Sequence, residues 1–288
     1  MYDRMSVNPG ETGLDEGICA TSVYRNQWDK VNGAPNSAVL NVAANMNRFF
    51  PGGIGVSFYH DAIGFSRQNN LLLNYSYPIN LGNIGVLGAG VGVGMMSYAM
   101  NPSWIPPQTL NDPSLPGNDF SAISLDLNFG LYLKGRNYYA GLSSTHLSES
   151  EMLGSATGIG VAGYSTARHY YVMGGYKLTD VGPGALDFNL MMRTDMVKYS
   201  VDINTRYFIK KDSKEIGYAG LTYRTSDALG IMLGYNAFKN FTCGYSYDLT
   251  LNKLSSISRG SHEFFVRYCF YLKNPPKTYS THPRWLGN

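Results

Sequence analysis

Three groups of residues in the sequence have side chains of the types that bind cofactors, hold metal ions or transfer protons. The first, Gly158-Ile159-Gly160-Val161-Ala162-Gly163, has the spacing of the fingerprint that binds the pyrophosphate of a dinucleotide. That chemistry needs a strand before the glycines and a helix N-terminus after them, whereas a tyrosine-rich strand pattern follows here. We therefore expect a flexible loop and no bound cofactor.

The second group runs from Thr145 to Glu151 and brings His146 close in sequence to Glu149 and Glu151. A histidine and two carboxylates can bind a divalent cation, but no second histidine stands at the spacing typical of metal ligands. This stretch is therefore predicted to be a solvated surface loop with no metal site.

The third group consists of charged residues that alternate with apolar residues in extended segments. A serine-type hydrolase would need serine, histidine and aspartate side chains that converge, and His262 and its neighbour Glu263 point to opposite faces of one strand. We predict no catalytic residues, and instead a network of ion pairs and hydrogen bonds inside a barrel. Its expected members are Asp126, Asp187, Arg193, Asp202, Arg206, Arg224, Asp248, Glu263 and Arg267.

The composition excludes several classes of protein. The 288 residues carry a net charge of +3 with scattered basic residues, which argues against nucleic-acid binding. Glycine (33) and tyrosine (23) are abundant, only 15% of residues are charged, and the mean hydropathy is slightly negative. The longest apolar stretch, from Ile84 to Met100, is interrupted by glycines and falls short of the about 20 apolar residues of a spanning helix. Membrane insertion would therefore require a closed barrel.

Alternation of apolar and polar residues with a period of two is the decisive pattern. It is clearest from Ser121 to Leu133, from Tyr199 to Ile209 and from Phe241 to Leu251. Aromatic residues gather at segment ends, and tight turns alternate with longer connections, as in transmembrane barrels. The sequence predicts an all-β, antiparallel transmembrane β-barrel of about 14 strands. The expected spans are 14–25, 36–49, 52–64, 67–82, 84–98, 120–135, 137–145, 166–179, 184–194, 198–210, 214–225, 228–238, 240–251 and 258–273.

We expect one domain over residues 1–288, with a short N-terminal segment (1–13), the barrel (14–273) and a C-terminal tail (274–288). An exported barrel needs a signal peptide, and we expect it to lie outside this numbering. Cys19, Cys243 and Cys269 are an odd number without close spacing, so we predict free thiols, buried or facing lipid.

The string Tyr24-Arg25-Asn26-Gln27-Trp28 by itself predicts an interfacial anchor and turn. With this string the sequence resembles the PorP/SprF family of type IX secretion system membrane proteins of Bacteroidetes. Further matching segments occur in the family's order, although Gly10 stands where alanine is usual. They are Asn8 to Gly13, Gly33-Ala34-Pro35, Gly52-Gly53-Ile54-Gly55, Asp61-Ala62-Ile63-Gly64, Tyr75-Ser76-Tyr77 and Gly260-Ser261-His262-Glu263.

The resemblance implies a non-enzymatic component of the outer membrane, needed for protein secretion, surface attachment or gliding motility. Its implied partners are other type IX secretion components, outer-membrane lipid, and a cell-surface adhesin with a C-terminal secretion domain. Residues implied to bind a partner are Tyr24, Arg25, Gln27, Trp28, Pro35, Ser261, His262 and Glu263. The alternative function is an outer-membrane porin or small-solute transporter, because a barrel of this size encloses a polar lumen.

Overall fold

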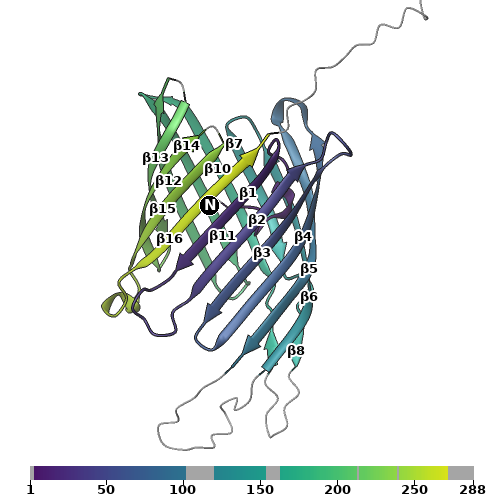
Figure 1. Cartoon of the computed structure of the whole chain (residues 1–288), viewed down its shortest axis with the longest axis vertical. Coiled ribbons are helices and arrows are strands. Elements are labelled where there is room, and N and C mark those ends of the chain that lie inside the picture. The colour runs from purple at the N-terminus through teal and green to yellow at the C-terminus, as the bar shows by residue number, and fades with distance from the viewer. Residues whose placement is uncertain (1–2, 102–119, 154–162, 213, 239, 272–288) are drawn as a thin grey trace, which may run out of the picture.

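The computed structural model is a closed antiparallel β-barrel (Figure 1), and it describes residues 3–101, 120–153, 163–212, 214–238 and 240–271. Fourteen strands form the wall, and the first strand pairs with the last to close it. The predicted architecture is therefore confirmed. Within the described residues, no helix is long and apolar enough to cross a membrane.

The strands are close to those expected from the alternation. The wall contains β1 (Ile18–Asn26), β2 (Asn36–Asn45), β3 (Gly53–Ile63), β4 (Ser66–Asn80), β5 (Val86–Met100), β6 (Phe120–Lys134), β7 (Tyr138–Thr145), β10 (His169–Val181), β11 (Gly184–Thr194), β12 (Tyr199–Lys211), β13 (Lys214–Arg224), β14 (Ala228–Phe238), β15 (Phe241–Thr250) and β16 (Ser261–Phe270). The barrel wall begins four residues later than predicted, because residues 14–17 continue the N-terminal segment.

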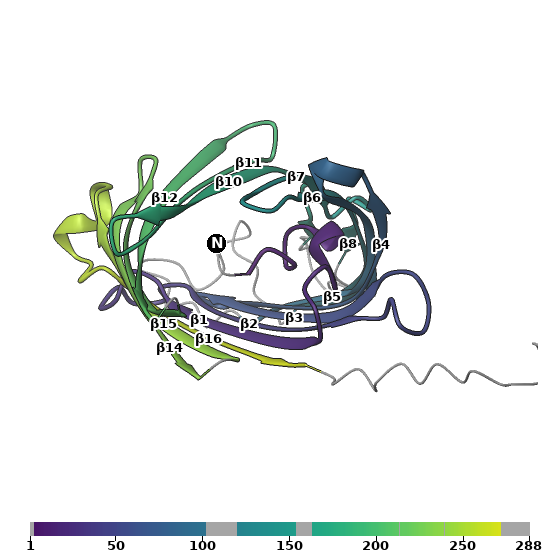
Figure 2. The ribbon, with the colours of Figure 1, turned by 90° about the horizontal axis from the view of Figure 1, so that it is seen from above.

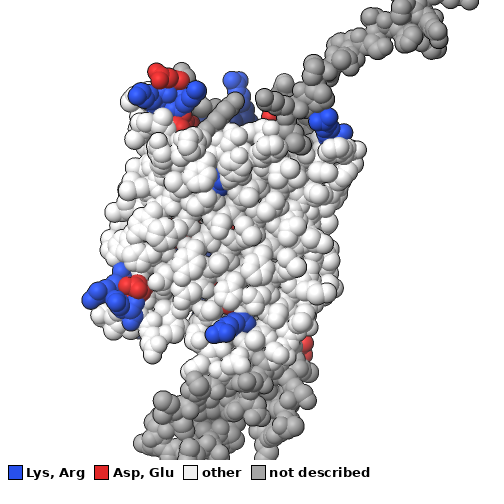
Figure 3. All heavy atoms as spheres, viewed as in Figure 1, with Lys and Arg blue, Asp and Glu red and all other residues white. Residues whose placement is uncertain are grey.

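The two faces of the wall have opposite character, as the alternation predicts. Apolar side chains such as Leu73 (63% exposed) and Leu221 (57% exposed) cover the outward face. Polar side chains such as Asn74 and Asn204 are buried inside. On the side of the barrel drawn in Figure 3, the outward face is a broad, mostly uncharged belt, with charged residues concentrated toward the two ends. This belt has the chemistry of a surface that contacts lipid.

The two ends of the barrel differ in the length of their connections. Turns such as 81–85 and 135–137 lie at one end, called here the short-turn end, together with the start of β1 and the end of β16. The longer connections, from β5 to β6 and from β7 to β10, start and end at the opposite, long-loop end, where these strands reach the bottom of Figure 1. Between β7 and β10, β8 (Glu151–Leu153) and β9 (Gly163–Ser165) form a separate two-stranded sheet, which the sequence pattern did not predict.

The N-terminal segment lies inside the barrel rather than beside it. Figure 2, which looks along the barrel, shows this segment within the ring of strands. It includes a short 3-10 helix, η1 (Pro9–Glu11), packed against β4, β5 and β6. Residues 3–17, the lumenal segment, fill part of the lumen toward the short-turn end.

One sequence-based prediction about the cysteines is wrong. Cys19 of β1 and Cys269 of β16 lie directly opposite each other and form a disulfide. Their 250-residue separation hid the pairing, because cross-strand neighbours at the closure of a barrel come from opposite ends of the chain. Cys243 is a free thiol, as expected.

Candidate functional site

Four of the residues expected at the site meet where β1 pairs with β16. Arg25 lies opposite Glu263 in the register of these strands, and the segment after Arg25 leads directly into the β1–β2 loop at the long-loop end. Strand periodicity turns Arg25 and Glu263 inward, because residues two apart share a face of a strand. We call this region, with Arg25, Trp28, Ser261 and Glu263, the seam cluster.

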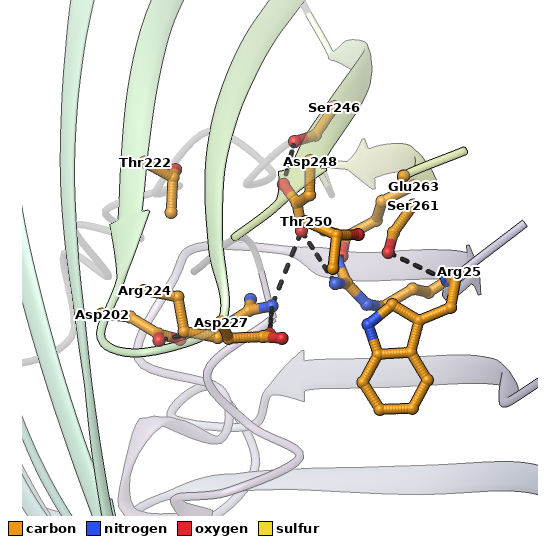
Figure 4. A network of polar contacts seen from close by, with 12 residues as sticks. Arg25, Asp202, Thr222, Arg224, Asp227, Ser246, Asp248, Thr250, Ser261 and Glu263 are labelled. Atoms are coloured by element: carbon orange, nitrogen blue, oxygen red, sulfur yellow. Dashed lines mark hydrogen bonds and ion pairs between the residues drawn. The ribbon is translucent and has the colours of Figure 1, made fainter. Parts of the chain in front are cut away.

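Arg25 connects the seam cluster to the neighbouring strands through ion pairs (Figure 4). Its guanidinium donates to Asp248 Oδ2 at 2.7 Å and to Glu263 Oε2 at 3.0 Å. Asp248 is also 3.5 Å from Arg224, which pairs with Asp202 and Asp227. Two arginines and four carboxylates therefore join β12, β13, β15, β16 and β1 in one buried network.

The network is suited to holding strands together and not to making or breaking covalent bonds. Arg25 and Arg224 have side chains only 15% and 17% exposed, so each needs its carboxylate partners to remain charged inside the barrel. The planar guanidinium of an arginine can bind two carboxylates at once with fixed geometry, so it links the strands that carry them rigidly.

The loop after β1 is fastened across the seam by main-chain hydrogen bonds. The Trp28 amide, at a φ of +53°, donates to Ser261 Oγ at 3.1 Å. The Asp29 amide donates to the Gly260 carbonyl at 2.7 Å, and the Gln27 amide donates to the Pro35 carbonyl at 2.9 Å. The Gln27 bond closes the base of the β1–β2 loop, and the Trp28 and Asp29 bonds join this loop to the β15–β16 loop as one surface at the long-loop end.

Tyr24 and His262, which were also expected at the site, lie on the outward face instead. Tyr24 is 47% exposed and its hydroxyl donates to Asn36 Oδ1 at 3.3 Å. His262 Nδ1 is 2.7 Å from the Tyr245 hydroxyl, and its neighbour Glu263 points inward, so the two face opposite sides as predicted. The structure thus divides the sequence-based set into an inner group and an outer pair.

A second region, the seat of the lumenal segment, is formed by residues that the sequence connected only with the family resemblance, such as Asn8, Gly10 and Ser76. The buried Asn8 donates through Nδ2 to the Leu131 carbonyl at 3.0 Å, and its Oδ1 accepts from the Gly10 amide at 2.9 Å. Ser76 Oγ donates to the Gly10 carbonyl at 2.9 Å. At Gly90 an added Cβ would lie 2.3 Å from Pro9, so only glycine lets the segment approach the wall this closely.

One signal for this seat was present in the sequence. Gly88, Gly90, Gly92 and Gly94 recur with a period of two, which places a row of hydrogen atoms on one face of β5. The same glycines are the ones that interrupt the apolar stretch from Ile84 to Met100. A row of glycines on the inner face of a strand indicates that another segment of main chain packs closely against it.

Ion pairs hold the C-terminal part of the lumenal segment, next to the start of β1. Asp15 pairs with Arg267 and with Lys134 Nζ, the latter at 2.5 Å. Burial opposes ionisation of Asp15, but these two cations outweigh it and bring the pKa of this carboxyl below its usual range. Burial, reinforced by the Asp15 carboxylate, raises the pKa of Glu11 to about 7, although Arg4 and Arg267 act against the rise.

The predicted lumenal network is present in the described residues. Arg206 pairs with Asp187, and Arg267 pairs with Asp15. Asp126 Oδ1 is hydrogen-bonded to His146 Nδ1 at 3.0 Å. Arg193 lines the lumen, and no ion pair involves it among the residues that the structure describes. Apart from Arg193, the network therefore has the members expected from the alternation, with Asp15 and Asp227 in addition.

The two loop stretches with candidate chemistry give different results. His146 bonds to Asp126, and the described residues contain no group of three histidine, cysteine or acidic side chains placed to hold a metal ion. The glycine string from 158 to 163 lies outside the described residues, apart from Gly163 at the start of β9.

Comparison with known proteins identifies the family. Residues 1–268 match the family described as type IX secretion system membrane protein PorP/SprF. Similar solved structures include the Ralstonia pickettii toluene transporter TbuX (13% identity, 93% of each chain, TM-score 0.56) and the CymD monoaromatic hydrocarbon channel (11% identity, 95% of this chain and 94% of that chain, TM-score 0.52). Such low identity shows the fold alone, and no curated protein matches in sequence. The chain belongs to the PorP/SprF family of type IX secretion system membrane proteins.

Proposed function

We propose that this barrel is a non-catalytic outer-membrane anchor for the type IX secretion machinery or for an exported adhesin with a C-terminal secretion domain. The family match carries the proposal, because the family is a component of that system. Transmembrane barrels have short periplasmic turns and longer outer loops, so the long-loop end faces the cell exterior and the short-turn end the periplasm.

The seam cluster is the proposed docking surface for the partner. Arg25 fixes β1 to β15 and β16, and main-chain bonds then fix the Trp28 loop to the Gly260 loop. A pre-ordered surface loses little conformational entropy on binding, which favours a stable anchor. Trp28 is of a residue type that contributes often to binding energy at interfaces, and Arg25 supports its loop from inside the barrel.

Surface display tests this proposal. Replacing both Arg25 and Trp28 by alanine should reduce display of the exported partner and its recovery with other type IX components. Heat-modified migration on gels separates loss of docking from an unfolded barrel. A matched control is Tyr199→Ala, which removes a 75% exposed aromatic residue at the same end of the barrel. Normal display and co-purification in the double variant would refute a docking role for this surface.

A solute channel is the second candidate, favoured by a lumenal cavity of about 510 Å³. Two barrels of similar fold are described as a toluene transporter and a hydrocarbon channel. Against a channel, the lumenal segment is fixed to the inner wall by Asn8, Asp15 and Ser76. Conductance of the purified wild-type protein in planar bilayers separates the two candidates, since a closed lumen passes no steady ion current.

A further inference from the structure

The lumen contains a cavity on the long-loop side of the lumenal segment that the anchoring role does not use. Asp3, Ser6 and Val7 of that segment line it on one side. Strand residues line the rest, including Asp126 on β6, Tyr171 on β10 and Arg193 on β11. Its volume of about 510 Å³ is in the range of pockets that bind small organic ligands, roughly 300–1,000 Å³.

The cavity is acidic. Seven carboxyl groups and three arginines line it, a formal excess of four negative charges, or of three when Asp3, whose pKa is raised by burial, is left out. The carboxylates are Asp3, Asp61, Asp126, Asp202, Asp227, Asp248 and Glu263, and the arginines are Arg25, Arg193 and Arg224. Arg25 and Arg224 are already shared among four of these carboxylates in the seam network. The field inside the cavity therefore favours a cation, although Arg193 opposes it locally.

Asp126 is a carboxylate of this cavity with a buried oxygen that has no donor in the described part of the chain. The residue is 1% exposed and its Oδ1 is 3.0 Å from His146 Nδ1. Its Oδ2 is buried, and no donor among the described residues reaches it. A buried carboxylate oxygen without a donor costs free energy, so a ligand N–H here would be strongly favoured.

The surroundings hold Asp126 in place. His146 adopts a φ of +57° at the end of β7, and its amide donates to Asn128 Oδ1 at 3.0 Å, which fixes the ring beside Asp126. The His169 ring lies 5.7 Å from that of His146, in an edge-on arrangement. Asp126 lines the cavity, and the terminal torsion of aspartate is soft, so rotation of the carboxylate can present Oδ2 to a ligand while the backbone and His146 stay in place.

We propose that this cavity binds an organic cation, with an ammonium or guanidinium group donating to Asp126. A metal ion would need several oxygen or nitrogen ligands at about 2–2.6 Å, and the described residues offer no such group of three. An organic cation needs one carboxylate and is also attracted to aromatic faces, and Tyr59, Tyr171 and two histidines line the cavity. This inference does not depend on the proposed anchoring function.

The cationic group can come from two sources. One is the lysine or arginine side chain of a polypeptide that enters from the long-loop end. The other is a free small amine or guanidine compound. Both would make the same charge-assisted hydrogen bond to Asp126, so a test must separate the chemistry of the site from the source of its ligand.

Binding to the purified full-length barrel in detergent micelles tests the chemistry. The probes are N-acetyl-arginine amide and its neutral isostere, N-acetyl-citrulline amide, followed by saturation-transfer NMR or calorimetry. We expect the arginine probe to bind at least about tenfold more tightly, and Asp126→Asn to remove this preference. Asp180→Asn is the control, because its side chain is 94% exposed at the short-turn end.

The outcomes are distinct. Equal binding of the two probes to the wild-type protein, or an unchanged preference in Asp126→Asn, would overturn the proposal. The wild-type comparison decides even if the variant fails to fold, which heat-modified migration reveals. A short acetylated peptide with one central arginine identifies the source, since tighter binding than the free probe indicates a polypeptide and equal binding indicates a small cation.

Discussion

Replacing Gly90 by alanine should release the lumenal segment while the barrel stays folded. A Cβ atom at this position would lie 2.3 Å from the carbonyl carbon and oxygen of Pro9. Unbonded atoms prefer separations of roughly 3.5 Å, so the segment must move by about 1 Å or more. Strand β5 itself should not suffer, because alanine loses less conformational entropy than glycine when a strand forms.

The size of the effect follows from the bonds near Pro9. A shift of this kind breaks the hydrogen bond from Asn8 to the Leu131 carbonyl and that from Ser76 to the Gly10 carbonyl. Each contributes about 1 kcal/mol, and lost packing of the buried Pro9 adds a similar amount. The docked state should therefore lose about 2–4 kcal/mol, which raises the undocked population by a factor of roughly 30 to 1,000.

Hydrogen exchange over residues 4–14 measures this population, and planar-bilayer conductance reports whether the lumen opens. Gly174→Ala is the control, because the nearest atom to its added Cβ is 3.6 Å away. Exchange in Gly90→Ala that equals exchange in wild-type protein and in the control would refute the argument. The segment would then not depend on the close approach at β5.

Three further predictions concern lipid contact, protonation and closure. Leu73→Arg, at the middle of β4 on the outward face, should destabilise the barrel by about 2–4 kcal/mol in urea titrations, whereas Ile79→Arg near the strand end should cost about 0–1 kcal/mol. Because the docked segment holds Glu11 with a pKa of about 7 against an ordinary 4.5, docking should weaken as pH rises between these values. Hydrogen exchange at pH 5 and 8 checks this, and Glu11→Gln should remove the difference. Cys19→Ser with Cys269→Ser should cost about 5 kcal/mol of stability in the chain-entropy estimate, and only the wild-type protein should change its heated gel migration on reduction.

The wall of the barrel follows closely from the sequence, because a strand that separates lipid from a polar lumen must alternate its side chains. β11 and β14 have the predicted bounds, 184–194 and 228–238. The inward direction of Asp126 and Asp248 follows from the same alternation. These features depend only on neighbouring residues, and local patterns report them directly.

The contents of the lumen depend on contacts between distant residues, and no local pattern reports those. Asn8 meets Leu131 across 123 positions, and Arg25 meets Glu263 across 238. The β8–β9 hairpin was missed because its strands have only three residues each, too few to alternate recognisably. The family resemblance selected Arg25 and Trp28, but their common surface required the closed wall.

The disulfide between Cys19 and Cys269 turns the chain between these residues into a covalent hoop. While the bond is intact, β1 and β16 cannot part at the level of Cys19 and Cys269, near the short-turn end, so the barrel cannot open sideways into the lipid there. At that end, whatever leaves the lumen must pass over the rim. The bond also fixes an order of assembly, because the last strand has to arrive beside the first before oxidation can occur.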